Sequence, residues 1–320
     1  IRNSEEVPLP GNKGGSTGTQ YSHYVIFEES LKFIRANKDK PFFCYLPITP
    51  PHGIFDIPDN DPAWADYKDK DWPEQARRYA AMVGMVDRQV GQVLDLLKEL
   101  KLDENTIVFF CGDNGGNNYF KTPDHPRGLH SANKHPKTGV EFRGGKGNRY
   151  EGGLRIPYLV RWPGKIKAGQ VSDLIFYQPD VMPTLAALTG AKAPRDIDGL
   201  SFLPTLVGAG EQEKHKMLYW EFGRQTAVRK GRWKAIQTNK NRPWALYDLD
   251  KDISETTDQS VKHPELLAEM KRFAAASHEP VRAGIFLDAK RKRHEKDRLA
   301  KWGTSKPQPR AKRPRKQPGK

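Results

Sequence analysis

A long amphipathic stretch followed closely by a short apolar run is the feature that most constrains the fold of this chain. Residues 106–111 read Thr-Ile-Val-Phe-Phe-Cys, a continuous apolar run typical of a strand buried on both faces. Asp71 and Pro73 are typical of a helix start. From residue 74 to residue 100, one helical stripe is apolar, formed by Tyr79, Val83, Val86, Val90, Val93 or Leu94, and Leu97.

The same alternation of helix and strand occurs on both sides of this pair. Residues 24–36 have apolar side chains at helical spacing, and residues 183–190 predict a helix that ends at Gly190. Residues 41–46 and 156–162 are further short apolar runs. This order predicts an α/β domain over residues 1–211, with a mostly parallel sheet flanked by helices.

The pattern changes after about residue 212. Short runs rich in Trp, Tyr and Val are separated by Gly, Asn and Pro, which predicts a small antiparallel sheet and then one helix over 264–275. We assign residues 212–280 to this C-terminal β subdomain and residues 281–320 to a basic, disordered tail. The predicted strands are 217–222, 226–229, 233–237 and 245–249.

Most of the net charge of +15 lies in the tail. Residues 290–320 hold 14 Lys and Arg against two acidic residues, a net +12 that leaves +3 for the other 289 residues. The body therefore gives no indication of specific nucleic-acid binding. The tail either keeps the protein in solution or binds polyanions. No apolar run is long enough to span a membrane, and Cys44 and Cys111 are expected to be buried small hydrophobes.

Four polar residues lie just beyond, or lead towards, the predicted strands. His52 follows the first strand, Asp113 and Asn114 follow the second, and Lys146 lies in a Gly-rich loop that leads to the third. Ligands of open α/β sheets bind outside the carboxyl ends of the strands. We therefore expect these four side chains to converge on one site.

Each of the four also has a plainer explanation. Asp-Asn-Gly is a common turn, His52 could be a surface loop residue, and Lys146 could be a solvated charge. The functional alternative makes Asp113 and Asn114 oxygen ligands of a hard cation such as Ca²⁺ or Mg²⁺. His52, stiffened by two prolines, would then transfer protons or bind an anion. Lys146 would be a point charge for a tetrahedral anion.

The sequence around Lys146 resembles the lysine-loop signature of the sulfatase family, within the alkaline-phosphatase-like superfamily. Residues 142–157 read Phe-Arg-Gly-Gly-Lys-Gly-Asn-Arg-Tyr-Glu-Gly-Gly-Leu-Arg-Ile-Pro and carry most of the likeness. Weaker matches extend it from about residue 20 to about residue 275. They are Pro-Pro-His at 50–52, Gly-Asp-Asn-Gly at 112–115, Asp-Val-Met-Pro-Thr at 180–184, Asp-Gly-Leu-Ser at 198–201 and Leu-Tyr-Asp-Leu at 246–249.

The resemblance implies an arylsulfatase-type sulfuric ester hydrolase. Its nucleophile is a hydrated formylglycine made in a Cys/Ser-x-Pro-x-Arg motif, and its cofactor is one divalent cation, usually Ca²⁺. Asp113 and Asn114 match two ligands of that cation. Lys146 and His52 match residues that bind the sulfate and stabilise the leaving oxygen. The implied substrate is a sulfate ester, with sulfated carbohydrate as one class, and the implied location is secreted or periplasmic.

Three elements of the family pattern do not occur in these 320 residues. Neither Cys44 nor Cys111 lies in the modification motif, and neither an Asp-Asp pair nor a Gly-Lys-x-His segment is found. We therefore expect a C-terminal portion of a sulfatase, inactive by itself. Two alternatives stay open at this point. One is a phosphatase or phosphodiesterase of the same superfamily, and the other is a non-catalytic fragment that binds polyanions through its tail.

Overall fold

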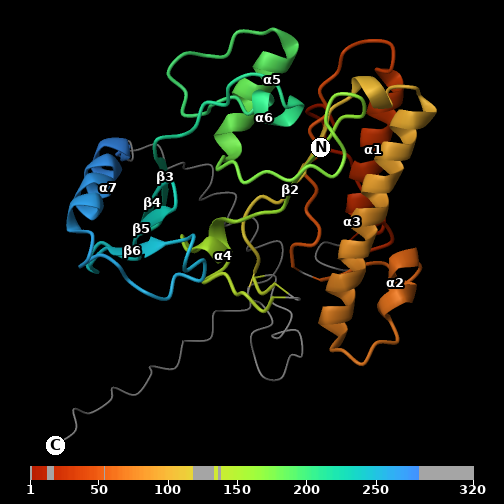
Figure 1. The fold of residues 1–320 in the computed structure, drawn as a ribbon. Coiled ribbons are helices and arrows are strands. Elements are labelled where there is room, and N and C mark those ends of the chain that lie inside the picture. The colour runs from red at the N-terminus through yellow and green to blue at the C-terminus, as the bar shows by residue number, and fades with distance from the viewer. Residues whose placement is uncertain (1, 13–17, 54, 118–132, 136–137, 281–320) are drawn as a thin grey trace, which may run out of the picture. The chain divides into compact units, whose positions relative to one another are not determined.

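The computed structural model describes residues 2–12, 18–53, 55–117, 133–135 and 138–280 (Figure 1). The chain forms two compact units. One comprises Tyr21–His278, and the described residues of the other are 2–12, 18–20 and 279–280. In the second unit, the Asn12 side chain donates to the Gln20 carbonyl at 2.8 Å. The predicted basic tail lies outside the described residues, so its proposed roles stay predictions.

The elements in the first half of the large unit are mainly helices, and its C-terminal part carries the antiparallel strands β3–β6 and the helix α7 (Figure 1). The elements in chain order are α1 (Ser22–Ala36), α2 (Pro62–Tyr67), α3 (Glu74–Glu99), η1 (Asp103–Asn105), β1 (Val108–Cys111), α4 (Glu151–Leu154), β2 (Tyr158–Arg161), η3 (Gln178–Asp180), α5 (Val181–Thr189), α6 (Leu203–Val207), β3 (Leu218–Phe222), β4 (Gln225–Lys230), β5 (Trp233–Gln237), β6 (Ala245–Asp248) and α7 (Pro264–Ser277).

The predicted helices are present, but the buried face of α3 matches the predicted stripe only in part: Val86 and Leu97 of that stripe are buried. Val83 belongs to the predicted stripe and is 44% exposed, whereas Met82 and Met85 are buried against Trp64 of α2. The apolar pattern does not reveal this face because Gln89 is part of it. Gln89 Oε1 lies 2.7 Å from Nε2 of buried His23 on α1, so a polar residue satisfies its hydrogen bond inside the helix contact.

The apolar run at residues 41–46 is not a strand of a described sheet, which corrects the sequence prediction. Its backbone is extended, and Phe42 and Cys44 pack against Ile34 and Leu97 of α1 and α3. The alternate side chains point away from that core, and Phe43 is 70% exposed. The segment therefore has one buried face instead of two.

The strands β1 and β2 pair in antiparallel register, with Val108 opposite Arg161 and Cys111 opposite Tyr158. The prediction of parallel pairing is therefore wrong for these two strands, and all described strand pairs are antiparallel. Periodicity along one strand does not specify its direction relative to a neighbour. Cys111 is exposed, contrary to expectation, and both cysteines are free.

The C-terminal prediction is confirmed: β3, β4, β5 and β6 form a four-stranded antiparallel sheet in chain order. The helix α7 covers one face of this sheet, where Met270 and Ala274 pack on Val228 and Leu246. Because the strands are joined by short connections, each pairs with its neighbour along the chain. None of the described helices is both long and apolar enough to cross a membrane.

Candidate active site

The candidate site begins where β1 ends. The pairing with β2 continues one residue beyond the strand, because the Gly112 amide donates to the Pro157 carbonyl at 3.3 Å. Asp113 follows with an exposed side chain. Asn114 is half-buried, and its Nδ2 donates to the Gly115 carbonyl at 2.9 Å. This bond fixes the amide plane and leaves Asn114 Oδ1 as the oxygen that could face a ligand.

The Asp113 loop and the loop that carries Lys146 are joined through their backbones. The Lys146 amide donates to the Gly116 carbonyl at 2.8 Å, and the Gly115 amide donates to the Gly153 carbonyl at 3.0 Å. A Cβ atom on Gly115 would lie 2.7 Å from the Gly153 Cα and in hard overlap with the Gly152 carbonyl. Glycine is therefore required for the two loops to approach this closely.

Residues 143–149 form the segment that we call the lysine loop. Gly144 and Gly147 flank its centre with φ angles of 78° and 84°, in the left-handed region that favours glycine. The Lys146 side chain is exposed. The structure therefore joins the loops of Asp113, Asn114 and Lys146 through their backbones, and the convergence of the four side chains on one site stays a prediction.

His52 is exposed, and its described hydrogen bonds are local. Its Nδ1 lies 3.1 Å from the Gly53 carbonyl oxygen, and its amide donates to the Thr49 carbonyl at 3.0 Å. The preceding bond between Pro50 and Pro51 is cis. The role of His52 beside Lys146 stays a prediction.

Asp113 and Asn114 fit a hard cation in the type of their donor atoms but not in their number. Ca²⁺ takes roughly six to eight oxygen ligands, whereas these residues offer a carboxylate and one amide oxygen. Among the residues that the structure describes, no group of three or more His, Cys, Asp or Glu side chains could hold a metal ion. These two residues alone do not form a complete metal site.

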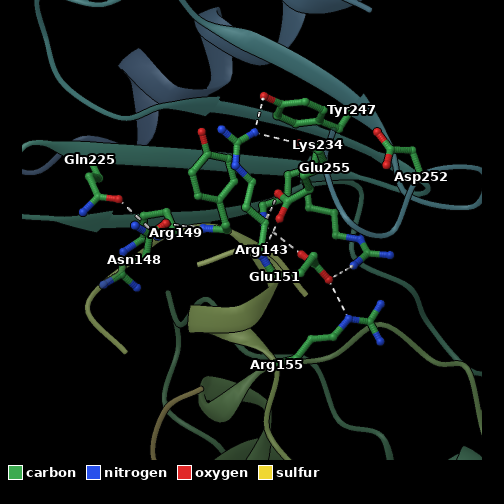
Figure 2. A network of polar contacts seen from close by, with 12 residues as sticks. Arg143, Asn148, Arg149, Glu151, Arg155, Gln225, Lys234, Tyr247, Asp252 and Glu255 are labelled. Atoms are coloured by element: carbon green, nitrogen blue, oxygen red, sulfur yellow. Dashed lines mark hydrogen bonds and ion pairs between the residues drawn. The ribbon is translucent and has the colours of Figure 1, made fainter. Parts of the chain in front are cut away.

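A buried charge cluster follows the lysine loop directly (Figure 2). Lys234 of β5 is fully buried, and its Nζ lies 2.8 Å from Glu151 Oε1 and 2.9 Å from Glu255 Oε1. The Glu151 amide donates to Glu255 Oε2 at 2.6 Å. The other carboxylate oxygen of Glu151 accepts from Arg155 Nε at 2.6 Å and lies 3.5 Å from Arg229.

The two carboxylates of this cluster differ in their electrostatic surroundings. Burial would raise the pKa of Glu151, but Lys234 and Arg155 together hold that pKa below its ordinary value. Burial raises the pKa of Glu255, and Lys234 opposes this shift only in part. Glu255 is therefore the member that first takes up a proton as the pH falls.

Further contacts join the lysine loop to the C-terminal sheet. The Arg143 guanidinium donates to the Glu255 carbonyl at 2.7 Å. The Gln225 side chain, at the start of β4, donates to the Gly147 carbonyl at 3.1 Å and accepts from the Arg149 amide at 3.2 Å. Figure 2 shows Gln225 beside Arg149, and Arg143 among Tyr247, Lys234 and Glu255.

Sequence reasoning did not single out Lys234, Glu255 or Gln225 as site-related residues. One signal was present, because Lys234 stands between apolar neighbours in a short predicted strand, where a lysine needs a buried partner. No local signal marks Glu255 or Gln225.

Comparison with known proteins shows the family of the chain. The profile of the family described as "Sulfatase" matches residues 2–191. The profile described as "N-sulphoglucosamine sulphohydrolase, C-terminal" matches residues 145–276. The chain belongs to the sulfatase family. The resemblance seen in the sequence is thereby confirmed.

Two curated relatives and one solved structure illustrate the range of this family. An N-acetylgalactosamine-6-O-sulfatase of Bacteroides thetaiotaomicron is 29% identical over 265 residues, which are 78% of this chain and 49% of the relative. The human steryl-sulfatase is 33% identical over 196 residues, 60% of this chain and 30% of the relative. The sulfatase chain thus spans about half, or less, of the length of these relatives.

The solved structure is Ps i-CgsB in complex with k-i-k-neocarrahexaose. It is 30% identical in sequence and superposes with a TM-score of 0.67. The match covers 85% of this chain and 56% of that structure's chain. The likeness confirms the α/β sulfatase fold.

Proposed function

We propose that this sulfatase chain supplies the part of an active site that binds the sulfate group of a sulfate ester during hydrolysis. The observation that carries the proposal is the backbone connection of the Asp113 loop to the lysine loop, between Gly116 and Lys146, and to the adjoining helix α4, between Gly115 and Gly153. This connection brings a carboxylate, an amide and an ammonium group to adjoining loops. The family match covers both loops.

In the proposed reaction, Lys146 binds a sulfate oxygen and stabilises the charge that develops on the ester oxygen as it leaves. His52 assists as a second donor at the same oxygen. Asp113 and Asn114 contribute two ligands of a divalent cation, Ca²⁺ by family resemblance. In a complete site that cation would polarise the sulfate, and a formylglycine would supply the nucleophile. The modification motif of the formylglycine does not occur in these 320 residues.

We propose sulfated carbohydrate as the substrate class. The names of the relatives support this choice, because one is an N-acetylgalactosamine-6-O-sulfatase and a solved neighbour is bound to a neocarrahexaose. A steryl-sulfatase among the relatives makes an apolar sulfate ester the alternative outcome of the test. A secreted or periplasmic location belongs to the same proposal and is tested by fractionation of the source cells.

The test assays the product of the complete gene on N-acetylgalactosamine 6-sulfate, its 6-phosphate analogue and a steroid sulfate. We expect the sulfated sugar to be hydrolysed fastest and Lys146→Ala to lower kcat/KM by about 100-fold or more. Lys165→Ala, which removes an exposed lysine in the turn after β2, is the matched control. Faster turnover of the phosphate ester, or equal losses in the two variants, would overturn the proposal. We expect the isolated 320-residue chain to show no turnover.

A further inference from the structure

The C-terminal sheet holds the lysine loop at both of its ends. At the start of the loop, Arg143 donates to the Glu255 carbonyl at 2.7 Å. At its end, Gln225 bridges the Gly147 carbonyl and the Arg149 amide at 3.1 and 3.2 Å. These partners lie 76 to 112 residues apart in the sequence, so a separate part of the fold helps to fix where the loop lies, together with the bond from Lys146 to Gly116.

The buried charges form a third attachment, just beyond the loop. Glu151 begins α4, Lys234 lies in the middle of the sheet on β5, and Glu255 follows β6. All three side chains are 3% exposed or less. Without the Lys234 ammonium, the buried Glu255 carboxylate would lose its ion pair and face the Glu151 carboxylate, so α4 would have to move away or one carboxylate would have to take up a proton.

The internal hydrogen bonds of the loop are few by comparison. Within the described residues, the Asn148 amide donates to the Gly145 carbonyl at 2.9 Å, and the Lys146 amide bonds outside the loop to Gly116. The glycines on both sides of Lys146 give the chain wide conformational freedom. Contacts from outside the loop must therefore restrict the position of its ammonium group.

We propose that Gln225, Lys234 and Glu255 are positioning residues that hold Lys146 where it meets the sulfate group. The C-terminal sheet thereby sets the affinity of the site for sulfate esters without touching the ester itself. This inference rests on the role proposed for Lys146.

The first experiment uses Gln225→Ala, because this change removes two hydrogen bonds without burying a charge. We expect amide hydrogen exchange in residues 143–153 of the purified 320-residue chain to become about tenfold faster, since two hydrogen bonds of ordinary strength are lost. Gln237→Ala is the matched control, because that glutamine donates to the Arg242 carbonyl at 2.9 Å, within the β5–β6 connection. It should leave exchange in the loop unchanged.

The second experiment uses Lys234→Met, which keeps the length of the side chain but removes its charge. We expect roughly 100-fold faster exchange of the loop amides, because breaking a buried ion pair is strongly destabilising. Lys230→Met is the matched control. Lys230 pairs with Glu269 of α7 at 2.5 Å on the neighbouring strand, and both side chains are about 40% exposed. Exchange within α7 reports whether either variant loosens the whole sheet.

Titration of the same chains with N-acetylgalactosamine 6-sulfate separates this inference from the proposed function. We expect the affinity to fall about tenfold in Gln225→Ala and not in Gln237→Ala. Unchanged exchange in the loop of Gln225→Ala, or an unchanged affinity, would overturn the positioning role. A wild-type chain that binds no sulfated sugar, while its loop still loosens in Gln225→Ala, would instead overturn the role of Lys146.

Discussion

At the scale of single residues, the site depends on glycines where backbone meets backbone. A Cβ atom on Gly153 would overlap the carbonyls of Asn148 and Gly145, and one on Gly152 would lie 2.6 Å from the Arg143 carbonyl. Backbone atoms cannot turn aside as a flexible side chain can, so any larger residue must separate the loops. The amount of space at each glycine, and not its φ angle alone, decides what a substitution does.

Gly115→Ala should therefore destabilise the chain and displace the lysine loop. We expect a loss of about 1–3 kcal/mol in the free energy of unfolding, as for other overpacked positions, measured by urea denaturation. Gly91→Ala is the control, because Gly91 lies inside α3, where a Cβ atom would meet no neighbouring atom within 4 Å. This change should stabilise the chain by about 0.5–1 kcal/mol. Equal effects of the two changes would contradict the backbone contact.

The sequence identified residues that carry local signals and missed residues that depend on distant partners. Asp113, Asn114 and Lys146 were proposed because a strand end or a glycine run marks each of them. The pairs of Lys234 with Glu151 and of Glu151 with Glu255 span 83 and 104 residues. Nothing in one segment specifies such a partner, and only the folded chain brings the two together.

At the scale of elements, pattern alone found the helices and only part of the faces that they bury. Val86 and Leu97 of the predicted α3 stripe are buried, but the buried row Met82, Met85, Gln89 contains a polar residue, and the apolar pattern did not mark it. The apolar run 41–46 likewise predicted two buried faces, although its alternate side chains are exposed. Composition reports how apolar an element is, whereas burial depends on which neighbour reaches each face.

The contact between α1 and α3 gives a prediction about pH. Burial lowers the pKa of His23 below its ordinary value of 6.5, although its hydrogen bond to Gln89 opposes the shift. The folded state therefore favours the neutral ring, while the unfolded state takes up a proton as the pH falls through 6.5. The free energy of unfolding should decrease from pH 7 down to the folded-state pKa of His23, and level off below it for this group.

Urea denaturation of the wild-type chain and of His23→Phe at several pH values between 7.5 and 5 measures this effect. The variant should be less stable at neutral pH, because Gln89 loses its buried partner. Its stability should also vary less with pH than that of the wild type. Parallel curves for the two proteins would show that His23 does not carry the pH dependence.

At the scale of the large unit, the apolar side chains fall into several separate clusters. One joins α2 to α3, one joins α1 to the end of α3 and to residues 42 and 44, and two lie on the faces of the β3–β6 sheet. The ion pairs of Lys234 with Glu151 and Glu255 link the segment after the lysine loop to that sheet through buried charges. The large unit is therefore stabilised by several small apolar cores and by specific ion pairs and hydrogen bonds. The lysine loop can loosen locally without unfolding of the whole unit.

The extended segment at residues 41–46 and the β1–β2 pair leave large apolar side chains in contact with water. Phe43 and Tyr45 are 70% and 76% exposed, and Leu159 of β2 is 59% exposed. Exposed apolar side chains on extended backbone favour association between copies of a chain. Phe43→Ser should therefore reduce self-association, measured by light scattering, and leave the thermal midpoint of unfolding nearly unchanged.

Phe42→Ser is the control from the opposite face of the segment. Phe42 packs on the cluster of Ile34 and Leu97, so its loss should lower the thermal midpoint of unfolding. If Phe43→Ser lowered the midpoint as much as Phe42→Ser, the segment would have two buried faces after all.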